Sequence, residues 1–223
     1  MPPDGFQLLT IRLGDPPDAW RALGFEAETL PGPGPSRVHL GNTTIELTSS
    51  GDGFEGWSLA GHTGSLDGLA DLATLRGVPD GPSGPPAGGT PPHPNGICAI
   101  DHVVVRTGDV DRTASVLGDA GLECRGERST DSYGPAMRQQ FYWLGDVILE
   151  LVGPGDPAQV TGDPASLFGL ALVSEDLDST TGSMGGLAGT PKDAVQQGRR
   201  IAGIRGREVG VSVPLAVMSP HPR

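Results

Sequence analysis

The sequence predicts an α+β protein built from paired β-α-β-β-β units, and two internal matches support this fold class. LGNTTIELTSSG (residues 40–51) matches LGDVILELVGPG (144–155), and IRLGDPPDAW (11–20) matches VVRTGDVDRT (104–113). In the first pair, a two-residue turn joins two short runs rich in apolar and β-branched residues, which is typical of a β-hairpin. A repeat of this length indicates a fold made from copies of one supersecondary unit.

The first copy opens with a predicted strand over residues 6–13 and a short helix over about residues 16–23. A hairpin that turns at residues 41–42 follows, and a second strand–helix start begins at Trp57. Each helix start carries Asp or Ser where an N-cap is expected, because such side chains accept bonds from the first free helix amides. The four predicted caps are Asp15, Ser65, Asp109 and Asp176.

Glycine and proline dominate residues 77–96, and this composition favours neither helix nor sheet. We therefore expect a linker there, in which His93 is exposed to solvent. The linker would separate a degenerate N-terminal half, residues 1–76, from a complete C-terminal domain, residues 97–223.

The C-terminal domain begins with a predicted strand over residues 100–106, followed by a helix that ends near Gly121 and a hairpin that turns at residues 145–146. A fourth strand–helix start begins at Phe168. The last predicted elements are a strand over residues 200–205, a turn over 206–210 and a closing strand over 211–218. Pro214 inside that closing strand requires an edge position or a bulge, because proline donates no hydrogen bond to a ladder.

His102 and Glu150 are the leading candidate site residues. Side chains two apart in a strand share a face, so His102 lies in a row with Ile100 and Val104, and Glu150 lies between Ile148 and Val152. Each strand thus carries one ionisable group in an apolar row. Burying such a group alone is costly, so each needs a partner, a ligand or a metal.

Two further sets of residues are candidates for ligand binding. Lys192 is the only lysine, and it lies near Gln196, Arg199 and Arg200 in an otherwise acidic chain. An arginine there would hold a carboxylate or phosphate in a bidentate manner, unless these charges pair with the surplus acids. In the predicted strand 137–144 a polar row alternates with a row that contains Phe141 and Trp143, so the site receives either polar donors or aromatic walls. The polar row provides the candidate ligand-binding residues. Its members are Arg138, Gln140 and Tyr142.

Composition excludes some classes of function. The net charge of −12 argues against a nucleic-acid partner, because phosphate binding needs a basic surface. No apolar run is long enough to cross a membrane, and the N-terminus lacks the features of a signal peptide. Cys98 and Cys124 make no disulfide framework. We expect a cytoplasmic protein that binds a small molecule, as a monomer or a homodimer.

These features together resemble the vicinal oxygen chelate superfamily, with DHVVV opening one unit and VILELVGP closing it. The resemblance implies a cup of sheet formed by two units, with a divalent metal held by residues on the first and last strands. His102 and Glu150 match these metal positions. Among the corresponding residues of the other units, only Glu46 keeps the pattern. The residues that depart from it are Leu8, Ser58, Gly169 and Ala216.

The resemblance implies a glyoxalase-like lyase or isomerase that acts through an enediolate on a small oxygen-bearing, anionic metabolite. Glu150 would then be a base or metal ligand and His102 a ligand or acid, with Zn, Ni, Fe or Mn as the metal. The incomplete ligand set leaves a metal-free, hydrogen-bonded pair equally open. In that case the protein would bind or sequester a small molecule, like the bleomycin-resistance members. Whether it is an enzyme therefore stays open.

Overall fold

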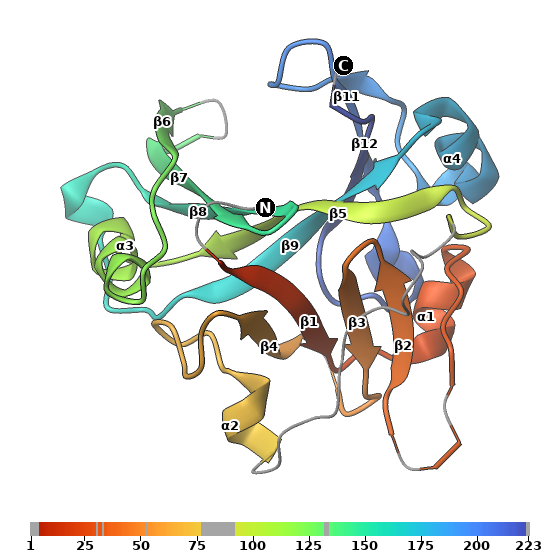
Figure 1. The fold of residues 1–223 in the computed structure, drawn as a ribbon. Coiled ribbons are helices and arrows are strands. Elements are labelled where there is room, and N and C mark those ends of the chain that lie inside the picture. The colour runs from red at the N-terminus through yellow and green to blue at the C-terminus, as the bar shows by residue number, and fades with distance from the viewer. Residues whose placement is uncertain are drawn as a thin grey trace. The chain divides into compact units, whose positions relative to one another are not determined.

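A computed structural model describes residues 5–29, 31–32, 34–51, 53–76, 92–131 and 134–221 (Figure 1). Residues 77–91 of the predicted linker lie outside the described residues. The regular elements are β1 (Gln7–Leu13), α1 (Pro17–Ala22), β2 (Ser36–Leu40), β3 (Thr43–Leu47), β4 (Phe54–Ala60), α2 (Leu72–Arg76), β5 (Ile97–Arg106), α3 (Val110–Asp119), β6 (Gly126–Thr130), β7 (Met137–Leu144), β8 (Val147–Pro154), β9 (Ser166–Ser174), α4 (Leu177–Met184), β10 (Lys192–Asp193), β11 (Arg200–Ile204) and β12 (Leu215–Met218). The hairpin turns predicted at residues 41–42 and 145–146 are confirmed.

The chain divides into two compact units, and both draw on the N-terminal and C-terminal halves of the sequence. The first unit contains the described residues within 1–9, 56–81 and 102–168. The second contains those within 10–55, 82–101 and 169–223. The boundaries predicted at residues 76 and 97 stay a prediction. Among the described residues, every helix is too short or too polar to span a bilayer.

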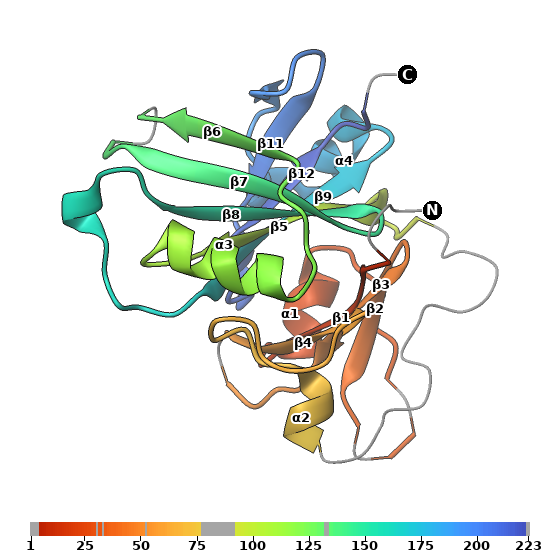
Figure 2. The same ribbon diagram turned by 60° about the vertical axis from the view of Figure 1, so that its left-hand side comes forward.

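In the first unit, the strands follow the order β5-β8-β7-β6. β5 is parallel to β8, and hairpins make the other pairs antiparallel. Helix α3 covers one face, where Val110 lies against Gly153 of β8 (Figure 2). Val103 and Leu149 on that face are fully buried. The opposite face, which we call the open face, carries partly exposed side chains such as Val104 and Ile148 in the same strands.

In the second unit, β1 is parallel to β3 and β2 is antiparallel to it, giving the order β2-β3-β1. A second ladder runs β10-β11-β12-β9, with β12 parallel to β9. The closing strand is shorter than predicted and begins at Leu215, directly after Pro214. Because Pro214 lies outside the strand, no ladder bond is lost, and its carbonyl accepts the amide of Leu170 at 3.0 Å.

Two of the four predicted helix caps are confirmed. Asp109 accepts the amide of Arg112 at 3.0 Å, and Asp176 accepts that of Ser179 at 2.9 Å. These bonds satisfy one free amide at the start of α3 and of α4.

The predictions for Asp15 and Ser65 are wrong. Asp15 is buried and accepts the indole N–H of Trp20 at 3.0 Å, and the residue before α1 is Pro16, which makes no side-chain cap. Helix α2 starts later than predicted, so Ser65 lies before it and donates to the Leu69 carbonyl instead. In both cases the side chain bonds to a partner other than the first free helix amides, so it does not act as a cap.

The prediction that His93 is exposed is also wrong, because the ring is 6% exposed. Its Nδ1 accepts the amide of Glu26 at 3.1 Å, and Nε2 lies 3.0 Å from the carbonyl of His39. These two bonds require a neutral ring with its proton on Nε2. Burial lowers the pKa of His93 from its ordinary value of 6.5.

We expect the free energy of unfolding to fall as pH drops below about 6.5, because the unfolded chain then binds a proton that folded His93 resists. His93→Gln, which keeps a polar group at the site, should flatten this pH dependence. Urea unfolding of both proteins at several pH values between about 5 and 8 measures it. Equal slopes in the two proteins would contradict the assignment.

Candidate functional site

His102 and Glu150 lie together on the open face, as strand alternation predicts. In the β5–β8 register His102 is opposite Ile148 and Val104 is opposite Glu150, so the two ionisable residues are diagonal neighbours. His102 Nε2 is 3.5 Å from Glu150 Oε2, and the side chains are 16% and 14% exposed. This is an ion pair whenever His102 is protonated, and its functional role stays a prediction.

Two side chains from neighbouring strands hold the Glu150 carboxylate. Gln139 on β7 donates to Oε1 at 2.5 Å, and Arg128 on β6 donates through Nε to the Gln139 side-chain oxygen at 2.7 Å. The resulting row, Arg128–Gln139–Glu150–His102, crosses all four strands. The guanidinium polarises the amide, so Gln139 is a better donor toward an anionic carboxylate. The row therefore fixes the orientation of Glu150.

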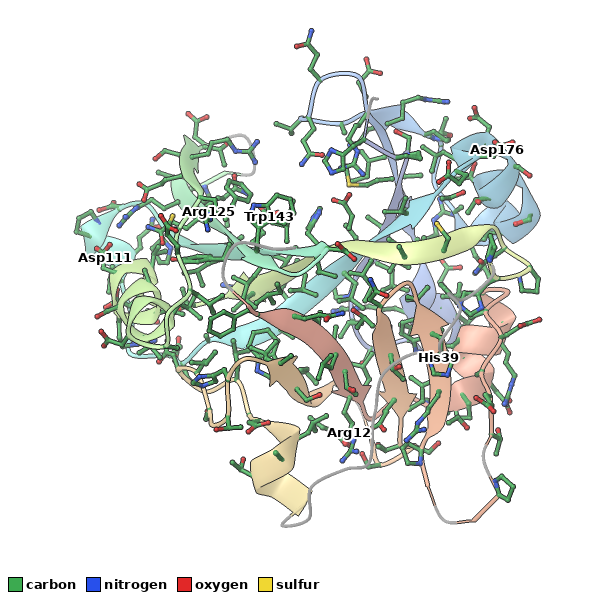
Figure 3. The ribbon with its side chains drawn as sticks, viewed as in Figure 1. Arg12, His39, Asp111, Arg125, Trp143 and Asp176 are labelled. Atoms are coloured by element: carbon green, nitrogen blue, oxygen red, sulfur yellow. The ribbon has the colours of Figure 1, made fainter. Side chains whose placement is uncertain are left out.

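Aromatic side chains flank this row on the open face. Phe141 is directly opposite Glu150, and Trp143 is opposite Ile148. Trp143 is 37% exposed, and Figure 3 shows it on the side of the sheet away from α3, which carries Asp111. The face thus combines a few oriented polar groups with flat apolar surface, the usual make-up of a small-molecule site.

The structure does not bring Arg138, Gln140 and Tyr142 to this site. Their partners in β8 face α3, so they lie on the covered face. Arg138 donates to Asp111 of α3 at 2.7 Å, and the hydroxyl of Tyr142 donates to the side chain of Gln140 at 2.6 Å. Burial raises the pKa of Tyr142, which therefore stays protonated. The bond from Arg138 to Asp111 supports the packing of α3 on the sheet.

Arg199 and its neighbours belong to the second unit. Arg199 is fully buried and donates to Asp101 at 2.6 Å and twice to the Ser219 carbonyl, at 2.7 and 2.9 Å. Gln196 accepts a further bond from the same guanidinium at 2.5 Å. The Arg199 guanidinium therefore bonds to partners inside the protein. This agrees with the second expectation for the cluster, in which its charges pair with acidic residues of the chain.

Lys192 is exposed and Arg200 half-buried, and both belong to the second unit. Arg200 donates to Asp178 at 2.7 Å, and this bond lowers the pKa of the Asp178 carboxyl. Lys192 lies on the two-residue strand β10, opposite Ile201. Arg200 is therefore also paired with an acid, and a role of either residue in anion binding stays a prediction.

The donor set of the described residues does not fit a resident metal ion. Among the ranges that the structure describes, no three His, Cys, Asp or Glu side chains gather as a metal site. At the predicted site, the described residues supply one imidazole and one carboxylate, from His102 and Glu150. Zinc ordinarily takes four ligands, and Mn or Fe take more, so two donors are too few.

We therefore expect the purified protein to contain zinc, nickel, iron and manganese far below one equivalent per chain. Inductively coupled plasma mass spectrometry of the protein, prepared without chelators, measures this content. The matched variant is His102→Ala, which should leave the trace metal content unchanged. One equivalent of metal in the natural protein, lost on this substitution, would contradict the expectation.

No protein-family model and no curated protein matches this sequence. Solved structures do match its fold. A mutant of 4-hydroxymandelate synthase from Streptomyces coelicolor aligns at 14% identity over 99% of this chain and 94% of that chain, with a TM-score of 0.64. A fusion of a xylose isomerase-like TIM barrel with 4-hydroxyphenylpyruvate dioxygenase aligns at 13% identity over 98% and 50%, with a TM-score of 0.56. Methylmalonyl-CoA epimerase from Mycobacterium tuberculosis aligns at 22% identity over 57% and 91%, with a TM-score of 0.46.

Proposed function

We propose that the open face of the first unit, in this chain with the vicinal oxygen chelate fold, binds a small oxygen-bearing metabolite. The contact between His102 Nε2 and Glu150 Oε2 carries the proposal. An imidazole and an oriented carboxylate side by side offer a donor and an acceptor to a hydroxyl or carbonyl group. The ligand binds without a resident metal.

The rest of the face supports an anionic ligand with a flat or apolar part. Arg106, at the exposed end of β5, is opposite Val152, which is in turn opposite Gln139, so Arg106 belongs to the open face. A guanidinium there suits a carboxylate. Trp143 supplies an apolar surface on the same face. This arrangement gives the anionic end of the ligand a partner within the first unit.

Proton transfer is the second candidate function, and the fixed orientation of Glu150 favours it. With its carboxylate held by Gln139, Glu150 would remove a proton from the carbon beside a carbonyl group. Protonated His102 would donate its proton to the carbonyl oxygen, giving a neutral enol. Glu150 then returns the proton to that carbon or to its neighbour while the enol hydroxyl returns its proton to His102, which completes an isomerase-type reaction. Exchange of that hydrogen for deuterium in D₂O, followed by NMR, separates catalysis from binding alone.

Binding is tested by calorimetry with pyruvate, lactate, 2-oxoglutarate and malate as probes. We expect at least one probe to bind saturably, and Glu150→Gln and His102→Ala each to weaken it about 10- to 100-fold, as for lost hydrogen bonds to charged groups. Arg138→Gln, on the covered face of the same sheet, is the matched control and should bind normally. Equal binding by all three variants would contradict the proposed site.

A further inference from the structure

A second site is suggested by the polar face of the sheet β2-β3-β1 in the second unit. Arg12, Glu46 and Arg37 lie directly opposite one another across its three strands. Glu28 pairs with Arg37 through a backbone bridge on the outer side of β2, so it extends this row. Charges of alternating sign therefore cross the face. The apolar residues of the same strands point to the other side, and they are Ile11, Val38 and Ile45.

A cavity of about 560 Å³ opens beside β2, and all of its lining residues belong to the second unit. Arg37 and His39 of β2 line it, together with Glu26 and Glu28 from the segment that pairs with β2. Phe25 provides apolar lining, and this volume is within the usual range for small-molecule sites. None of these residues belongs to the open face of the first unit.

The charges of the lining balance, with two arginines and two glutamates. Arg21 is occupied, because it donates to Asp18 and to the carbonyl of Ala27. Within the described ranges, the Arg37 side chain donates from one terminal nitrogen to Glu46 at 3.4 Å and is 29% exposed, so other N–H groups of its guanidinium are available to a ligand. A balanced lining of this kind favours a dipolar ligand over a simple anion or cation.

Two histidines fix the geometry of the acidic side. His39 Nδ1 is 3.0 Å from the Thr44 hydroxyl, and its Nε2 is 3.6 Å from the carboxylate of Glu28. His93 is bonded to backbone through both nitrogens and packs edge-on against Phe25, with ring centroids 5.3 Å apart. These contacts place Glu28 beside His39 and hold the apolar wall in position.

We propose that this cavity binds a free α-amino acid as its zwitterion. Arg37 binds the carboxylate and Glu28 the ammonium group. The two residues are directly opposite across an antiparallel backbone bridge, and in such pairs Cβ atoms lie about 4.5–5.5 Å apart, so they suit two opposite charges attached to one carbon. The side chain of the amino acid lies against Phe25 and Ala27, which favours an apolar or aromatic one.

Calorimetry with L-phenylalanine and L-leucine tests this proposal. Phenethylamine lacks the carboxylate and N-acetyl-L-phenylalanine lacks the ammonium charge, so each should bind at least about 10-fold more weakly than phenylalanine. Glu28→Gln and Arg37→Gln should each weaken phenylalanine binding by a similar factor. Glu28 is 59% exposed, so its variant is expected to fold even if Arg37→Gln does not.

The matched controls are Glu123→Gln and Arg125→Gln, which break a surface pair of the same chemistry in the first unit, 3.0 Å apart. Both should bind phenylalanine normally. Absence of binding by the natural protein at millimolar amino acid would overturn the proposal, as would unchanged binding by Glu28→Gln. Loss of binding in Trp143→Phe with retention in Glu28→Gln would assign the amino acid to the open face instead.

Discussion

Replacing Arg199 by alanine is expected to lower the free energy of unfolding by about 3–5 kcal/mol, the usual cost of leaving a buried charge without its partner. The Arg199 and Asp101 side chains are 1% and 2% exposed, and their ion pair measures 2.6 Å. The same guanidinium bonds the Ser219 carbonyl, next to the end of β12. The variant therefore removes the guanidinium partner of a buried carboxylate and two bonds to the residue that follows β12. Urea unfolding monitored by circular dichroism measures the change.

The neighbouring residue provides the matched control. Arg200 makes a similar pair with Asp178, but both side chains are largely exposed, at 44% and 69%. Pairs of that kind contribute little, because water and salt screen them. Arg200→Ala should therefore unfold close to the natural protein. If Arg199→Ala instead kept its stability and lost ligand binding, Arg199 would have the ligand-binding role that the sequence predicted.

Replacing Glu46 by alanine is expected to cost about 3 kcal/mol of unfolding free energy or more, again because buried charges lose their partner. Glu46 is 1% exposed and contacts Arg12 at 2.5 Å and Arg37 at 3.4 Å. Its repeat counterpart Glu150 is 14% exposed and has an uncharged amide, Gln139, as its strand neighbour. The two carboxylates occupy equivalent repeat positions, but only Glu46 is enclosed by guanidinium groups.

Glu150→Ala is therefore the informative comparison for Glu46→Ala in the same unfolding experiment. We expect Glu150→Ala to lose less unfolding free energy than Glu46→Ala. Glu150→Ala should also lose metabolite binding. Equal unfolding midpoints for Glu46→Ala and the natural protein would show that the ion pairs of Glu46 with Arg12 and Arg37 do not stabilise the N-terminal repeat.

The repeats and hairpins could be predicted because their signals are local. Glycine with Asn or Asp at residues 41–42 and 145–146 sets tight turns, and alternation then assigns each side chain to a face. The turn at 145–146 also pairs Leu144 with Val147, and counting outward places Phe141 opposite Glu150. That register would have selected Gln139, Phe141 and Trp143 for the open face and excluded Arg138, Gln140 and Tyr142.

Contacts between distant segments could not be predicted in this way. Asp15 is bonded to Ser212, Arg199 to Asp101, and His93 to residues near position 26 and to His39. Each of these partners is far away in sequence, and no turn or periodicity fixes the pairing. The sequence therefore predicts an exposed His93 and a ligand-binding Arg199, whereas both are buried and bonded inside the protein. Proline and glycine around His93 indicated a linker, although the ring lies in the core.

Iodide quenching of tryptophan fluorescence tests most directly whether a ligand occupies the open face. Trp20 and Trp57 are fully buried, so iodide reaches Trp143 alone among the three tryptophans. The 2-oxo or 2-hydroxy acid that binds by calorimetry should reduce quenching by about half or more, and Glu150→Gln should abolish this protection. A probe that binds with full affinity while Trp143 stays equally accessible to iodide would contradict a site at His102 and Glu150.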